Sequence, residues 1–206
     1  MHRRTAISVS AALLLAAPLL SACSGGTRPG TAAVVGGERI TTSALQAQVN
    51  DVRAAQDRSG AGAQLIGATP QLERVKLGRM IQLRILEKAA DDAGISVSTK
   101  DVEDARKARQ GNGTAAALEL SALQNRIPLA PGQIDDDLRF QLLFAKITER
   151  FGQDKFLEPL AKAAEQLHIE VNPRYGAWDA QQIGLGQAQT PWITQRTQAD
   201  QPPAGA

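Results

Sequence analysis

The fold is decided by the stretch at residues 71–93, which reads QLERVKLGRMIQLRILEKAADDA. Strong helix formers fill this stretch, and it contains no proline and only one glycine, Gly78. When its residues are placed at 100° intervals around a helix, apolar side chains fall on every side. A helix that is apolar all round is usually buried, with neighbours packed on more than one face. The stretch therefore predicts the central helix of a small helical domain, ended by Gly94 as a left-handed cap.

Further helices are predicted on both sides of this stretch. Before it, Leu45 and Val49 begin an apolar stripe at helical spacing, and the Gly- and Ala-rich residues 57–70 then predict a mobile loop. After it, Ser98 and Asp101 have the spacing of a capping box, which starts the next helix. The predicted helices cover, in order, residues 43–58, 71–93, 99–110, 114–125, 131–151 and 155–167.

Two extended segments lie at opposite ends of this helical region. Ala33–Val35 reads as a short strand, and a tight turn at Gly36-Gly37 leads to a second extended piece at Arg39-Ile40. At the other end, residues 168–172 alternate between polar and apolar like a strand. Aromatic residues make up only 3% of the chain, which disfavours a β-sandwich. The sequence therefore predicts a mostly α protein with a few short strands.

The first 22 residues have the pattern of an export signal. They begin with MHRR and continue with an apolar run to Leu20 that is too short to span a bilayer comfortably. Leu20, Ser21 and Ala22 then precede Cys23. These four residues resemble the lipobox of bacterial lipoproteins. The resemblance implies that Cys23 becomes the mature N-terminus and carries palmitate-type acyl chains, which bind membranes through about 0.8 kcal/mol per buried CH₂ group.

The alternative is an ordinary secretory signal followed by a free cysteine, but Cys23 is the only cysteine of the chain, which favours the lipoprotein. The lipobox implies anchoring on the extracytoplasmic face of the cell membrane. Residues 23–32 are predicted to form a flexible tether and residues 33–179 the folded domain. Residues 180–206 are rich in Gln, Gly, Thr and Pro, which predicts a disordered tail.

Composition disfavours several classes of function. Removing Arg3 and Arg4 from the 23 basic residues leaves 21, which equals the number of acidic residues, 21. A neutral mature chain argues against nucleic acid as a partner, since such binding depends on excess Lys and Arg. His168 is the only histidine after the signal peptide, so we predict no metal site and no histidine-dependent catalytic group. We expect no enzyme activity, no nucleotide and no cofactor.

Three segments resemble a known family. Residues 33–41 read AVVGGERIT, residues 93–103 read AGISVSTKDVE, and residues 171–178 read VNPRYGAW. In order and spacing they are similar to segments of SurA N-terminal domains, of PrsA-type foldase lipoproteins and, more distantly, of trigger-factor-like chaperones. The resemblance covers about residues 32–179. It implies a helical bundle in which the opening strand pairs with the closing strand, here Ala33–Val35 with Ile169–Val171.

The chain departs from this family at one place. Foldases of the family carry a parvulin isomerase domain between the long helix and the closing helix, whereas only residues 152–154 separate Phe151 from Lys155 here. Parvulin chemistry also relies on a pocket lined by His and by Cys or Asp, which this chain cannot supply. The resemblance therefore implies the chaperone-like part of the family without prolyl isomerase activity.

The candidate binding residues lie on the predicted helix 131–151. Phe140, Phe144, Ile147 and Phe151 share one side of it and include three of the four Phe residues of the chain. Two interpretations are open. The stripe lines an apolar groove for extended polypeptide, as the resemblance implies, or it is packed in the core, which is the usual role of such a stripe.

These observations together predict a chaperone-like lipoprotein, anchored in the membrane, that holds exported unfolded polypeptides. The alternative is a structural or accessory envelope lipoprotein that uses the same fold to bind one dedicated protein partner. Broad binding of unfolded apolar peptides would favour the first function, and a single stoichiometric partner would favour the second.

Overall fold

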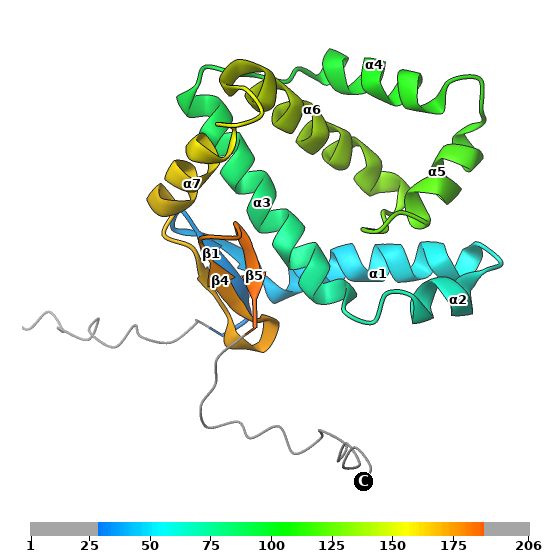
Figure 1. Ribbon diagram of the computed structural model, residues 1–206. Coiled ribbons are helices and arrows are strands. Elements are labelled where there is room, and N and C mark those ends of the chain that lie inside the picture. The colour runs from blue at the N-terminus through cyan, green and yellow to red at the C-terminus, as the bar shows by residue number, and fades with distance from the viewer. Residues whose placement is uncertain (1–28, 188–206) are drawn as a thin grey trace, which may run out of the picture.

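A computed structural model describes residues 29–187, and α3 (Leu72–Asp92) is their central element. Figure 1 shows α3 crossing the middle of the molecule between α1 (Thr42–Arg58) and α7 (Leu157–Gln166). Side chains on several sides of α3 are almost wholly buried, among them Leu77, Ile81, Ile85, Leu86 and Ala90. The predicted central helix and the mostly α fold are therefore confirmed.

Local hydrogen bonds end α3 where the sequence predicts. Gly94 adopts a φ of 67°, which an L side chain rarely does. The amide of Ile95 then donates to the carbonyl of Ala90 at 2.8 Å, and the amide of Gly94 donates to that of Asp91 at 3.1 Å. This pair of bonds is a Schellman motif, which satisfies carbonyls that the end of a helix leaves unpaired. Gly94 is thus the predicted left-handed cap.

The two ends of the domain meet in a small antiparallel sheet. Its strands are β1 (Thr31–Val35), β2 (Glu38–Thr41) and β3 (Glu170–Val171), in the order β2-β1-β3. Ala33 lies opposite Val171, so the predicted pairing of the opening and closing segments is confirmed. The second extended piece is β2, which makes the sheet three-stranded rather than two-stranded.

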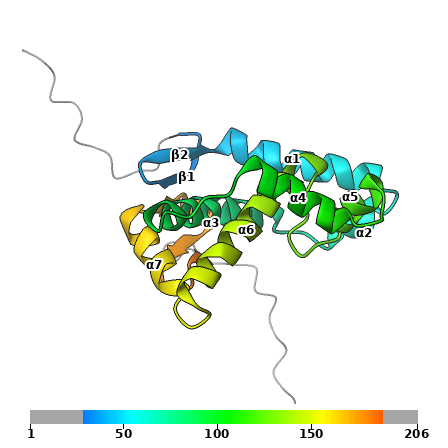
Figure 2. The same ribbon diagram turned by 90° about the horizontal axis from the view of Figure 1, so that it is seen from above.

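The remaining helices pack around α3. Figure 2 shows α1 and the β1–β2 hairpin along one side of α3, with α7 on the other. Ser98 and Asp101 form the predicted capping box at the start of α4. The predicted loop at 57–70 is partly wrong, because six of its residues form α2. The helices not yet given are α2 (Gly62–Gly67), α4 (Thr99–Gln110), α5 (Ala115–Leu123), the 3₁₀ turn η1 (Pro131–Gln133) and α6 (Ile134–Phe151).

Both predicted boundaries of the domain need correction. Thr31 and Ala32 are fully buried in β1, so the tether cannot extend to residue 32. At the other end, β4 (Ala177–Asp179) pairs with β5 (Gly184–Gly186) after the turn η2 (Pro173–Tyr175), so the predicted disordered tail cannot begin at residue 180.

Contacts with α3 hold this C-terminal hairpin in place. Arg74 donates to the carbonyl of Leu185 at 2.8 Å, and Gln82 donates to that of Ile183 at 3.2 Å. The side chain of Leu185 also lies close to Gly78, where an added Cβ would come within 3.7 Å of it. That distance is an ordinary van der Waals contact, so the hairpin packs directly against the surface of the central helix at this point.

The predicted signal peptide, the lipobox residues Leu20, Ser21 and Ala22, and Cys23 all lie outside the described residues, as does the chain beyond residue 187. Their assignments stay predictions. Within residues 29–187, none of the helices is both long and apolar enough to cross a membrane.

Candidate functional site

The predicted stripe on α6 is divided between core and surface. Ile147 is fully buried, and Phe140 is half-buried. By contrast, Phe144 and Phe151 are 39% and 38% exposed, which is unusual for large aromatic side chains. The structure therefore brings the four residues onto one helix but leaves only two of them exposed on its outer surface.

Two further apolar residues extend the exposed part of this stripe. The ring of Phe156 meets that of Phe144 edge to face, with 5.2 Å between the ring centroids and 75° between the planes. Leu157, the first residue of α7, is 55% exposed. We call the surface formed by Phe144, Phe151, Phe156 and Leu157 the α6–α7 corner. Sequence analysis missed the last two, although an adjacent Phe-Leu pair directly after a short interhelical turn is itself a signal of an apolar surface.

A shallow hollow adjoins this corner. Its volume is about 360 Å³, and its walls come from the end of α3, from Phe151 and from the first turns of α7. Its lining combines polar side chains, Asp92, Glu158 and Lys162, with apolar ones, Ala89, Ala93 and Pro159.

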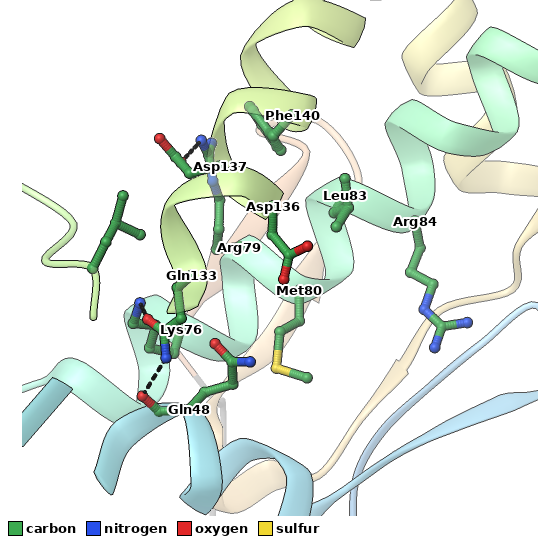
Figure 3. A pocket seen from close by; sticks show the side chains of 11 residues that line it. Gln48, Lys76, Arg79, Met80, Leu83, Arg84, Gln133, Asp136, Asp137 and Phe140 are labelled. Carbon is green, nitrogen blue, oxygen red and sulfur yellow. Dashed lines mark hydrogen bonds and ion pairs between the residues drawn. The ribbon is translucent and has the colours of Figure 1, made fainter. Parts of the chain in front are cut away.

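A second cavity lies at the other half of α6, where that helix faces α1 and α3. Figure 3 shows the side chains that line it, which come from all three helices and from the segment before α6. The cavity has a volume of about 230 Å³. Its apolar wall consists of Met80, Leu83, Leu129 and Phe140.

Among the residues that line the cavity, Lys76 is the most buried, with 3% of its surface exposed. Its ammonium donates to Oε1 of Gln133 at 2.6 Å. Burial lowers the pKa of Lys76 to about 8, while the nearby carboxylate of Asp137 raises it and the guanidinium of Arg79 lowers it further. Sequence analysis missed this residue, although a lysine in a helix that is apolar on every side has no exposed face to occupy.

An ion pair stands beside this lysine. Arg79 donates to Asp137 at 2.5 Å, and its guanidinium carbon lies 3.1 Å from the centre of the Phe140 ring. The second carboxylate oxygen of Asp137 accepts from Gln141 at 2.6 Å. The cation–π contact explains why Phe140 is covered while its neighbour Phe144 on the stripe is not.

The acidic residues at the start of α6 do not form a metal site with one another. Asp135 forms an ion pair with Arg106 of α4 at 2.6 Å, whereas Asp137 forms one with Arg79 of α3. Among residues 29–187, no three His, Cys, Asp or Glu side chains are grouped so that they could hold a metal ion.

One comparison identifies the family. The family model described as the SurA-like N-terminal domain matches residues 3–126, which is more than half of the chain. The chain belongs to this family. No curated protein and no solved structure matches the chain significantly.

The SurA-like match includes part of the cavity but none of the α6–α7 corner. It spans α1 and also α3, which carries Lys76 and Arg79. It stops before α6 and α7, which carry the α6–α7 corner. SurA-like N-terminal domains are chaperone-type, non-catalytic domains whose partners are polypeptides. The SurA-like fold predicted from residues 33–41 and 93–103 is thereby confirmed.

Proposed function

We propose that this SurA-like protein is a chaperone-like lipoprotein, anchored on the extracytoplasmic face of the cell membrane, that holds exported unfolded polypeptides. The holding site is the α6–α7 corner. No nucleotide, cofactor or covalent chemistry takes part, because burial of apolar surface alone supplies the binding free energy, at about 25 cal/mol per Å².

The observation that carries the proposal is the clustering of exposed apolar side chains. Within the described part of the chain, five large hydrophobic residues are exposed, and three of them, Phe144, Phe151 and Leu157, lie at this corner. Single exposed apolar residues are ordinary on protein surfaces, but a contiguous group marks an interaction site. The other two, Val75 and Leu120, stand on α3 and α5.

The proposal includes the absence of prolyl isomerase activity. Isomerisation requires a shaped pocket that stabilises a twisted peptide bond against a barrier of ~18–20 kcal/mol. Only residues 152–156 connect α6 to α7, and they form a tight turn with Gly152 at a φ of 83°. A connection of this length supports a protein that holds polypeptides without isomerising them.

An aggregation assay tests the holding function. The chain without its signal peptide should slow the aggregation of several unrelated unfolded proteins at near-stoichiometric ratios. Changing Phe144 and Phe151 together to Ser should remove most of this protection and leave the fold intact. The matched control is Leu120→Ser, which removes an equally exposed apolar side chain from α5 and should keep full protection.

Two outcomes would overturn the proposal. If the folded protein protects none of the test proteins, the general holding function fails, and a crosslinked single partner of fixed stoichiometry would support the accessory lipoprotein instead. If Leu120→Ser and the double variant lose protection equally, the corner is not the holding site.

The anchor is tested separately. Replacing Cys23 with Ala should abolish incorporation of labelled palmitate and release the protein from the membrane or retain it as an uncut precursor. Continued labelling of the variant would contradict the lipobox assignment.

A further inference from the structure

The cavity between α1, α3 and α6 contains an amine that the protein does not fully satisfy. A lysine ammonium has three N–H donors. Gln133 accepts one hydrogen bond from the ammonium of Lys76. Within residues 29–187, the other two N–H groups of the ammonium have no acceptor, and no carboxylate forms an ion pair with Lys76. Burying a charge without such a partner is costly.

A structural role does not account for this arrangement. Gln133 connects the three helices by itself, because its amide donates to the carbonyl of Gln48 at 2.9 Å and its oxygen accepts from the amide of Ala130 at 3.3 Å. An apolar residue at position 76 would leave both of these bonds in place. The charge of Lys76 is therefore not needed to assemble the cavity.

Arg79 adds a second positive charge to the lining of the same cavity. Its Nε atom is buried and has no hydrogen-bond acceptor in the part of the chain that the structure describes, so this residue can act on a ligand through its charge rather than through Nε. Arg79 and Lys76 stand three residues apart on α3, so their side chains project from the same side of the helix. Figure 3 shows both side chains at the cavity, next to Gln133 and Asp137.

We propose that this cavity binds a carboxylate attached to a short apolar group, with Lys76 Nζ donating to the carboxylate and the charge of Arg79 attracting it. The apolar group would lie against Met80, Leu83 and Phe140, which line the same space. The ligand is either a free monocarboxylic acid or the C-terminal end of a polypeptide, and both present the same chemistry.

Size and charge define this ligand class. A cavity of about 230 Å³ is smaller than the pockets of about 300–1,000 Å³ that hold drug-sized ligands, so it has room only for a small group. Asp136 and Asp137 also line the cavity and would repel a dianion such as a phosphate monoester more strongly than a single carboxylate. Burial lowers the pKa of Lys76 to about 8, so an anion that binds there stabilises the charged form of the amine.

Met80 provides the reporter. The chain contains only two methionines, Met1 and Met80, so ¹³C-methyl labelling gives one signal that lies inside the cavity. The protein would be titrated with hexanoate, with hexanamide, and with acetyl-Ala-Ala-Leu carrying either a free or an amidated C-terminus.

A carboxylate probe should shift the Met80 methyl signal saturably and bind at least tenfold more tightly than its amide. Lys76→Met should remove this preference, whereas Lys107→Met, on the exposed face of α4, should keep it. Asp136→Asn should tighten binding about threefold, because a repelling charge at the cavity is removed. Raising the pH from 7 to 10 should weaken binding, because Lys76, whose pKa is about 8, loses its charge over this range. The charged groups that act on Lys76 are Asp51, Arg79 and Asp137.

The two sources are separated by the same titrations. Binding of hexanoate without the peptide identifies a free acid as the ligand, and binding of the peptide with a free terminus identifies a chain end. The proposal is overturned if amides bind as tightly as carboxylates, if Lys76→Met leaves the preference unchanged while the variant stays folded, or if no probe moves the Met80 signal. None of these outcomes depends on the aggregation assay, so the proposed cavity ligand and the proposed holding function of the α6–α7 corner are tested independently.

Discussion

The two halves of α6 use the same kind of side chain in opposite ways. In the first half, Phe140 lies under the guanidinium of Arg79, and an ion pair and a buried lysine surround it. In the second half, Phe144 packs edge to face with Phe156 and is 39% exposed. Helical periodicity places Phe140 and Phe144 on one face, so the neighbouring helix decides which of them is covered. The comparison separates a polar cavity from an apolar contact surface on a single helix.

The largest effect should come from the member of the stripe that is fully buried. Changing Ile147 to Ser leaves a cavity and a buried hydroxyl, and should lower the free energy of unfolding by about 4 kcal/mol. Phe144→Ser should lower it by less, about 1–2 kcal/mol, because that residue is 39% exposed and loses less buried surface. Urea unfolding of both variants measures the difference. Equal losses would show that the second half of α6 is ordinary core.

A second prediction concerns the buried amine of the first half. The folded-state pKa of Lys76 is about 8, below its ordinary value of 10.5, so the unfolded chain binds more protons between these two pH values. The free energy of unfolding therefore increases as the pH rises across this window, and this gain is lost as the pH falls back through 8. At neutral pH, a shift of this size means that the buried, charged amine lowers the free energy of unfolding by about 3 kcal/mol.

Lys76→Met removes that cost together with one hydrogen bond to Gln133, and should raise the free energy of unfolding at pH 7 by about 2 kcal/mol. The advantage of the variant should shrink as the pH rises from 8 to 10.5. Denaturant unfolding at pH 7 and pH 10 provides the measurement. A variant that is less stable than the natural protein at pH 7 would mean that the lysine is structural.

The smallest effect separates the two Phe residues directly. Phe140→Leu removes the ring under Arg79 and should cost about 1 kcal/mol of stability, whereas Phe144→Leu should cost less. Thermal unfolding of the pair gives the comparison. A larger loss from Phe144→Leu would contradict the assignment of that residue to the surface.

The elements that sequence analysis predicted correctly depend on local signals. Gly94 caps α3, and Ser98 with Asp101 starts α4, because each of these groups bonds to backbone only a few residues away. The pairing of β1 with β3 joins distant segments, and it was predicted only because the resemblance to SurA N-terminal domains implies it.

The features that were missed depend on distant neighbours. Lys76 is buried by residues more than fifty positions later in the chain, including Gln133. The β4–β5 hairpin has no alternating pattern of its own, and it forms where Arg74 and Gln82 of α3 donate hydrogen bonds to its backbone. A pattern within one segment contains no information about such contacts.

The central claim is that unfolded polypeptide binds at the α6–α7 corner, and site-specific photocrosslinking tests it most directly. A photoreactive amino acid would replace Leu157 at the corner or Leu120 on α5, which is similarly exposed. With an unfolded test protein added, the account predicts strong adducts from position 157 and few from position 120. Equal adducts from both positions, or none from position 157, would contradict it.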